Sequence, residues 1–203
     1  MKIRYNAPIT LTFALLSACI LLLDQFTGQT LILRFFSIPG KGYFNPASPL
    51  EYIRLFSHIL GHAGWAHLLG NFSIILLIGP ILEEKYGSAP FFMMILTTAL
   101  VTGVLNVLFF PTGLLGASGA AFMMILLAPF TNTKSGDIPL TFILIVILYI
   151  TKQVYSSFQN NSIAEFAHLA GGACGSIFGF FHLHREPEIR EGISFPEDSR
   201  PGD

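Results

Sequence analysis

The chain has 203 residues, of which 52% are hydrophobic and only 11% are charged, and its formal net charge is −1. This composition is typical of an integral membrane protein and excludes an ordinary soluble domain. A net charge this close to zero gives no reason to expect a nucleic acid partner. The two cysteines, Cys19 and Cys174, are too few for a disulfide framework or a metal site, so we expect them to be small core residues.

The apolar segments predict an all-α, polytopic membrane protein in which six transmembrane helices surround a water-filled cavity. The expected helices cover roughly residues 7–23, 61–82, 89–109, 118–130, 138–154 and 164–181. The first follows Lys2 and Arg4 but has no convincing small-residue cleavage site, so we interpret it as a mature helix and not a signal peptide. We expect residues 1–183 to form one transmembrane domain and residues 184–203 to form a polar, disordered cytoplasmic tail.

The distribution of Lys and Arg predicts the orientation in the membrane. Six spans place both termini on one side, together with the loops that hold Lys85 and Lys134. That side carries seven of the 11 basic residues, and the other side carries four. By the positive-inside rule, both termini are expected in the cytoplasm, and the short fourth span is then approached from the outer face.

The segment 24–57 between the first two spans is too rich in aromatic and aliphatic residues for a solvated linker, although prolines and glycines interrupt it. We expect a partly buried interfacial loop with short helices. Two readings stay open for this loop, a structural clamp and a surface that contacts substrate.

A polar cluster opens the second span and consists of His58, His62, His67 and Asn71. Polar groups at this depth usually face the bundle interior or a water cavity. His67 and Asn71 are four residues apart and therefore project from one helix face. We weigh a metal site, structural hydrogen bonding and a pair of donors that stabilises an anion. Asparagine is a poor zinc ligand and no Cys, Asp or Glu lies at matching depth, so we predict no metal and favour the donor pair.

The second span ends with Glu83 between Gly79 and Gly87. A carboxylate in this position is expected to accept hydrogen bonds from backbone or hydroxyl donors at the helix end. We interpret it as a structural site and not as part of the chemistry.

Ser118 lies in a run from residue 88 to residue 133 that carries no formal charge. The helix that begins there has 13 apolar or small residues, about 20 Å of length against a hydrocarbon thickness of about 30 Å. The helix must therefore begin roughly 10 Å below one membrane face. Non-helical backbone survives at that depth only where it is buried in protein or lines a wet cavity, so we expect loop 110–116 to do one or the other.

The last span carries Gly171, Gly175 and Gly179 at four-residue intervals, which form a smooth ridge for close helix contact. Its best partner is the small-residue start of the fourth span, which includes Gly116 and Gly119. His168 lies one turn before the ridge and on the same face, so this packing would bring it beside Ser118.

A serine beside a histidine is the minimal pair for acyl transfer, with the serine as nucleophile and the histidine as general base and then general acid. The oxyanion of the transition state needs donors, and His67, Asn71 and the backbone N–H of Ser118 are candidates. Glu165 could approach His168, but we expect an interfacial role for it. We therefore predict a Ser118–His168 dyad, not a triad.

These residues resemble the rhomboid intramembrane serine proteases, in their basic six-span bacterial form, over nearly the whole chain. Four matches carry the resemblance, namely the nucleophile motif at 116–119, the base motif from His168 to Gly171 and Gly175, the pattern His62, His67 and Asn71, and the Gly79, Glu83 and Gly87 signature. It implies cleavage of transmembrane segments of other proteins, in a bacterial inner membrane, without metal or cofactor. It also implies that His67 and Asn71 help to form the oxyanion hole and that small residues are favoured beside the scissile bond.

Two positions depart from the family pattern. Many members carry Trp-Arg where this chain has Ile53-Arg54, which puts the anchoring of the outer loop in doubt. Many members also place tyrosine where this chain has Phe122, so stacking on the histidine should persist while a hydrogen bond from the hydroxyl is lost. The rival readings are a non-catalytic relative that binds transmembrane helices and a small transporter or channel. The oligomeric state stays open.

Overall fold

The computed structural model describes residues 5–132, 137–157 and 162–183. Their elements are α1 (Pro8–Phe26), α2 (Leu31–Phe35), α3 (Pro49–Ser57), the 3-10 helix η1 (His58–Leu60), α4 (Trp65–Tyr86), α5 (Ser88–Phe109), α6 (Ser118–Leu127), the 3-10 helix η2 (Ala128–Asn132), α7 (Leu140–Ser157) and α8 (Ser162–Leu183). The tail expected at 184–203 lies outside the described residues.

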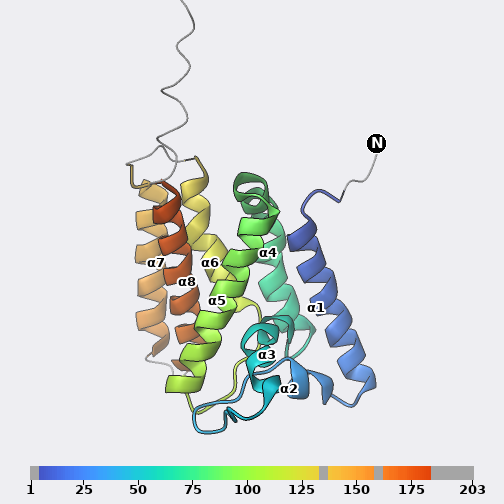
Figure 1. Cartoon of the computed structure of the whole chain (residues 1–203). Helices are drawn as coiled ribbons and strands as arrows, with labels where there is room; N and C mark the ends of the chain where they lie inside the picture. The colour runs from blue at the N-terminus through green and yellow to red at the C-terminus, as the bar shows by residue number, and fades with distance from the viewer. Residues whose placement is uncertain (1–4, 133–136, 158–161, 184–203) are drawn as a thin grey trace, which may run out of the picture.

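The chain is an all-α, polytopic membrane protein, as the sequence predicts. Six helices, α1, α4, α5, α6, α7 and α8, run side by side as a bundle and correspond to the six expected spans (Figure 1). In the described part of the chain, α1, α4 and α5 are each long and apolar enough to cross a bilayer. The start of α1 and the end of α8 lie at the same end of the bundle, and α2 and α3 lie near the other end (Figure 1).

The short helix α6 lies at the centre of the bundle, in contact with both α4 and α8. Met123, Met124 and Leu127 have no exposed surface, because the helix is covered on several sides. A Cβ added at Gly119 would lie 3.1 Å from Cγ2 of Thr102 on α5. Thr102 is seven residues before the end of α5 at Phe109, which is about 10 Å along the helix. This depth agrees with the submerged start that the sequence predicts for α6.

The second membrane helix begins later than predicted. The sequence suggested a start at residue 61, whereas α4 begins at Trp65 and residues 58–60 form the separate turn η1. The backbone is extended at Gly61 and approaches the outer segment so closely that a Cβ there would overlap the carbonyl oxygen of Phe36. His58 and His62 therefore precede α4, and only His67 and Asn71 belong to it.

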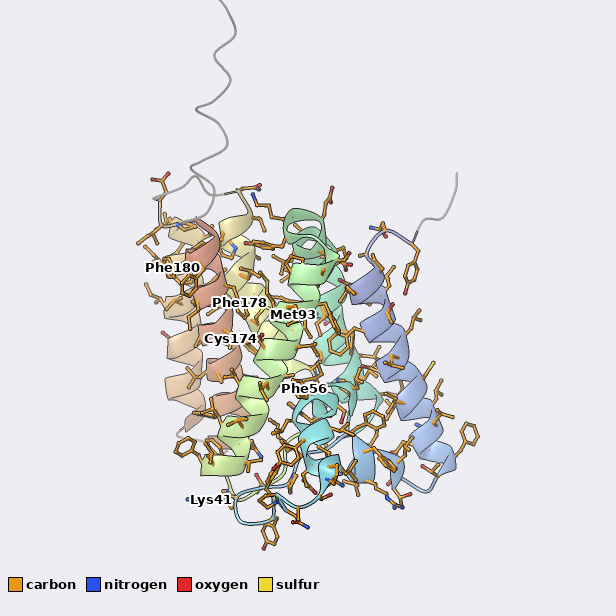
Figure 2. All side chains as sticks on the ribbon, in the orientation of Figure 1. Lys41, Phe56, Met93, Cys174, Phe178 and Phe180 are labelled. Atoms are coloured by element: carbon orange, nitrogen blue, oxygen red, sulfur yellow. The ribbon has the colours of Figure 1, made fainter. Side chains whose placement is uncertain are left out.

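The prediction for the cysteines was half right. Cys174 is buried on α8, where Figure 2 labels it, but Cys19 is exposed on α1. In a membrane helix the face toward lipid is as apolar as the face toward protein, so an apolar neighbourhood in the sequence does not separate the two.

The outer segment contains the short helices that the sequence predicts, α2 and α3. The guanidinium of Arg54 on α3 donates to the carbonyl oxygen of Arg34 near the end of α2, with its Nε at 2.8 Å, and pairs with Glu51 at 2.7 Å. Asp24 of α1 accepts the backbone N–H of Ile32 at 2.8 Å. These contacts hold the loop although Ile53 stands where the resemblance leads us to expect tryptophan, and they favour the clamp reading.

The carboxylate of Glu83 joins the end of α4 to the starts of α1 and α5, which confirms its predicted structural role. It accepts the backbone N–H groups of Ile9 at 2.9 Å and Thr10 at 3.0 Å, and the hydroxyls of Thr10 at 2.9 Å and Ser88 at 2.7 Å. Its side chain is buried, so its oxygens gain from protein donors what water would otherwise supply.

We expect Glu83→Gln to lower the free energy of unfolding by about 2 kcal/mol, because an amide NH2 would face donors and lose the charge-assisted bonds. Thermal unfolding of the detergent-solubilised protein measures the change. Glu84→Gln is the matched control, since Glu84 is the exposed neighbour. Equal melting temperatures for the two variants would contradict the structural role of Glu83.

Candidate active site

Ser118 is the first residue of α6 and is partly exposed, while the residues on either side of it are buried. The chain enters the helix through Gly116, whose φ of +113° is a conformation that side-chain-bearing residues rarely adopt. A serine in this place presents its hydroxyl at a helix N-terminus, where free N–H groups and the helix dipole favour negative charge.

Loop 110–117, which leads to Ser118, is held by hydrogen bonds to the outer segment. Ile38 and Leu114 exchange two backbone hydrogen bonds of 2.9 and 3.0 Å, an isolated antiparallel bridge. The side-chain amide of Asn106 on α5 donates to the carbonyl oxygen of Thr112 at 3.1 Å. Asn106 was not predicted from the sequence, although an asparagine within an apolar span was an available signal.

The last residues before Ser118 are held by the histidines ahead of α4. The backbone N–H of Gly116 donates to the carbonyl oxygen of His58 at 2.9 Å, and that of Ala117 donates to Nε2 of His62 at 3.4 Å. Nδ1 of His62 lies 3.2 Å from the carbonyl oxygen of Leu60, which assigns the proton to Nδ1. With its proton on Nδ1, the neutral ring of His62 has an unprotonated Nε2 that can accept.

His67 and Asn71 both face Gly116. A Cβ added at Gly116 would lie 2.8 Å from Nε2 of His67 and 3.6 Å from Nδ2 of Asn71. Nδ1 of His67 lies 3.5 Å from the backbone N–H of Ala63 and accepts from it, which leaves the proton on Nε2. The buried Nδ2 of Asn71 has no hydrogen-bond partner among the described residues. The N–H donors of His67 and Asn71 therefore both lie beside Gly116, two residues before Ser118.

His168 lies on the opposite side of this site, on α8. Its ring stacks on Phe122 with 4.2 Å between the ring centroids and 29° between the planes. Phe122 is four residues after Ser118 and so lies one turn away on the same face of α6. The stacking agrees with the expectation that a phenyl ring suffices here.

The glycine ridge of α8 makes this approach possible. A Cβ added at Gly171 would overlap the carbonyl oxygen of Gly119, and one at Gly175 would overlap that of Met123. The packing of α6 against α8 that the sequence predicts is therefore confirmed. The side chain of Glu165 lies outside the side chains that the structure describes.

The structure shows two contacts among the residues that the sequence singled out. His67 and Asn71 lie beside Gly116, just before the start of α6, and His168 stacks on Phe122, one turn after Ser118. Such an arrangement can hold a nucleophile between a base and a pair of donors. His62 has a structural role instead, because its ring accepts a hydrogen bond from the backbone N–H of Ala117.

Comparison with known proteins agrees with this arrangement. A family model described as Rhomboid domain matches residues 49–185. The putative rhomboid protease YdcA of Bacillus subtilis is 28% identical over 174 residues, which are 78% of this chain and 86% of that protein. Rhomboid protease GlpG of Pectobacterium atrosepticum is 24% identical over 187 residues, 90% of this chain and 66% of that protein. Rhomboid-related protein 1 of Caenorhabditis elegans is 28% identical over 166 residues, 75% of this chain, and the chain spans about half (46%) of its length.

We expect Gly171→Ala to lower the free energy of unfolding by about 2 kcal/mol, because the new methyl group meets a backbone carbonyl that cannot move aside easily. The matched control is Gly70→Ala on α4, where a Cβ has no atom within 4 Å. This control should keep or gain stability, since alanine favours a helix by up to about 1 kcal/mol. Thermal melts in detergent give the comparison, and equal stability of the two variants would argue against the close contact of α6 and α8.

Proposed function

Because the chain belongs to the rhomboid family, we propose that it is an intramembrane serine endopeptidase that cleaves transmembrane segments of other membrane proteins. The family match and the proteases named among its relatives support hydrolysis of peptide bonds. The apolar helices make it an integral membrane protein. The residues of the reaction are proposed from the geometry around Ser118.

Ser118 acts as the nucleophile and His168 as its base. The Ser118 hydroxyl attacks the carbonyl carbon of the scissile bond while the imidazole accepts its proton. The same imidazole then donates that proton to the leaving amine, and water hydrolyses the acyl-enzyme with His168 again as base. Phe122 acts as a positioning residue, because its stacked ring restricts the imidazole to one orientation.

The oxyanion of the tetrahedral intermediate is stabilised by donors that are already in place. Nδ2 of Asn71, Nε2–H of His67 and the backbone N–H of Ser118 are the proposed donors, and the N-terminus of α6 adds its dipole. Because these groups are fixed before substrate arrives, little reorganisation is needed when the charge develops.

The observation that carries the proposal is the unsatisfied amide of Asn71. A buried donor without a partner costs about 1–3 kcal/mol, so a purely structural asparagine would normally be hydrogen-bonded. The nearby Asn106 is satisfied by loop carbonyls, whereas Asn71 has no partner among the described residues and points to the start of α6. A donor kept free for a charge that forms during the reaction accounts for this difference.

The depth of the site supports a substrate segment that lies in the membrane, while the proposed orientation rests on the distribution of Lys and Arg. Ser118 lies about 10 Å inside the end of α5, so the scissile bond must come from a segment that itself enters the bilayer. We place both termini in the cytoplasm of a bacterial inner membrane, with the site open to the outer face. No metal or cofactor takes part in the proposed reaction.

Ser118→Ala should abolish cleavage of a fluorogenic transmembrane-segment peptide by the protein in liposomes, because it removes the hydroxyl that is proposed to attack the scissile carbonyl. The fold should persist, since only an oxygen atom is removed. Ser176→Ala on α8 is the control, because that hydroxyl bonds within its own helix to the carbonyl oxygen of Gly172. If the Ser118→Ala protein cleaved as fast as the control, Ser118 would not be the nucleophile. If the wild type bound the peptide without cleaving any of several substrates, a non-catalytic helix-binding protein would be favoured.

Asn71→Ala should lower kcat about 10- to 1000-fold with little change in KM, because the lost donor acts on the transition state. Ser73→Ala, an exposed position on the same helix, serves as the control. Steady-state kinetics in liposomes, with thermal melts to confirm folding, separate the two. A well-folded Asn71→Ala protein with normal kcat would remove Asn71 from the mechanism.

A further inference from the structure

An apolar recess lies between α1, α5 and the α3–η1 segment, and none of the residues proposed for the reaction lines it. It is a groove of about 510 Å³. Its walls include Phe13 and Leu16 of α1, Phe56 and Leu60 of α3 and η1, and Ile95 and Leu96 of α5. Figure 2 places Phe56 on α3 at the level where that helix approaches α5.

The groove lies at the depth of lipid tails. Its α5 residues, Phe92 to Leu96, are four to eight residues from the start of α5, or about 6–12 Å into the membrane. The α1 wall begins at the same level, because Glu83 binds the starts of both helices. The occupant is therefore taken from the hydrocarbon region and not from water.

The chemistry of the walls requires an apolar occupant. The hydroxyls that line the groove belong to Thr12 and Ser57, and both already have partners. Thr12 is hydrogen-bonded to the hydroxyl of Tyr5 at 2.9 Å, and Ser57 donates to the carbonyl oxygen of Phe35. The groove therefore offers dispersion contacts and no free polar group.

The groove is too small to enclose a protein helix. A helix about 10 Å across has a cross-section of roughly 80 Å², so 510 Å³ would hold only about 6 Å of it, or roughly four residues. A single flexible hydrocarbon chain is narrower and can follow the groove. We propose that this groove binds one acyl chain of a membrane phospholipid.

Such a lipid would stabilise η1, which holds the loop of the proposed active site. In the proposed complex the acyl chain packs against Ile59 and Leu60 of η1, which line the groove. The first residue of η1 is His58, whose carbonyl oxygen holds the N–H of Gly116. Ile53 lines the groove, and 59% of its surface is exposed. Many family members carry tryptophan at this position. The smaller isoleucine of this protein therefore leaves a space in the groove that an indole ring would narrow.

Photolabelling with lipid tests the proposal independently of peptidase activity. The full chain is reconstituted in phosphatidylcholine vesicles that contain phosphatidylcholine with a diazirine on one acyl chain, and adducts are mapped by mass spectrometry. Random contact with bulk lipid would label residues of similar depth in order of exposure, so Leu77 (72%) and Ile81 (57%) on α4 should exceed Phe56 (39%). A retained chain reverses this order and labels Phe56 and Leu96 above both.

Ile53→Trp should lower labelling of the groove roughly ten-fold, if the indole excludes about two methylene groups of the chain. Leu77→Trp adds the same bulk on an exposed face of α4 and should leave groove labelling unchanged. Leu16→Trp fills the groove from α1 and replaces Ile53→Trp if that variant does not fold. Labelling in order of exposure, or groove labelling that both filling variants leave unchanged, would overturn the proposal.

Discussion

The structure depends on one constraint, which is that backbone polar groups inside a bilayer must find partners within the protein. Loop 110–117 descends into the membrane as non-helical chain, and neighbouring segments satisfy it. Ile38 pairs with Leu114, the carbonyl oxygen of His58 accepts from Gly116, and the ring of His62 accepts from Ala117. The outer segment and η1 are therefore the reason that a helix can begin in mid-membrane with a serine at its first position.

Close contact between α6 and α8 meets a requirement of the proposed mechanism, which needs donors on one side of Ser118 and a base on the other. Glycine carries this contact, since a Cβ at Gly171 would overlap the backbone at Gly119. Van der Waals packing of small residues drives such association in membranes, where lipid tails are as apolar as leucine. The stacking of His168 on Phe122 thus follows from a backbone approach that glycine alone permits.

The sequence predicts the helices, the ridge on α8 and the group around Gly116, because polar and small residues stand out in apolar sequence. It does not predict the start of α4 at Trp65, since the extended backbone before that helix is set by the close approach of Gly61 to the distant Phe36. It also does not distinguish a side chain that faces lipid from one that faces the protein core, because both surroundings are apolar. Cys19, which is exposed on α1, is the example. The pairing of Ile38 with Leu114 uses backbone atoms and leaves no trace in residue types.

The neighbouring residues His62 and His67 have different roles, one in holding the loop and one in the proposed chemistry. His62 carries its proton on Nδ1 and accepts from Ala117, whereas His67 carries its proton on Nε2 and presents a donor to Gly116. Their ring centroids are 5.1 Å apart, yet the two tautomers differ, so Nε2 is a hydrogen-bond acceptor in His62 and a donor in His67. The backbone N–H groups of Leu114, Gly116 and Ala117 have partners in neighbouring segments, whereas the amide Nδ2 of Asn71 has none among the described residues. Because an unpaired buried donor is costly in a membrane interior, this difference is a physical reason to expect an anion beside Asn71.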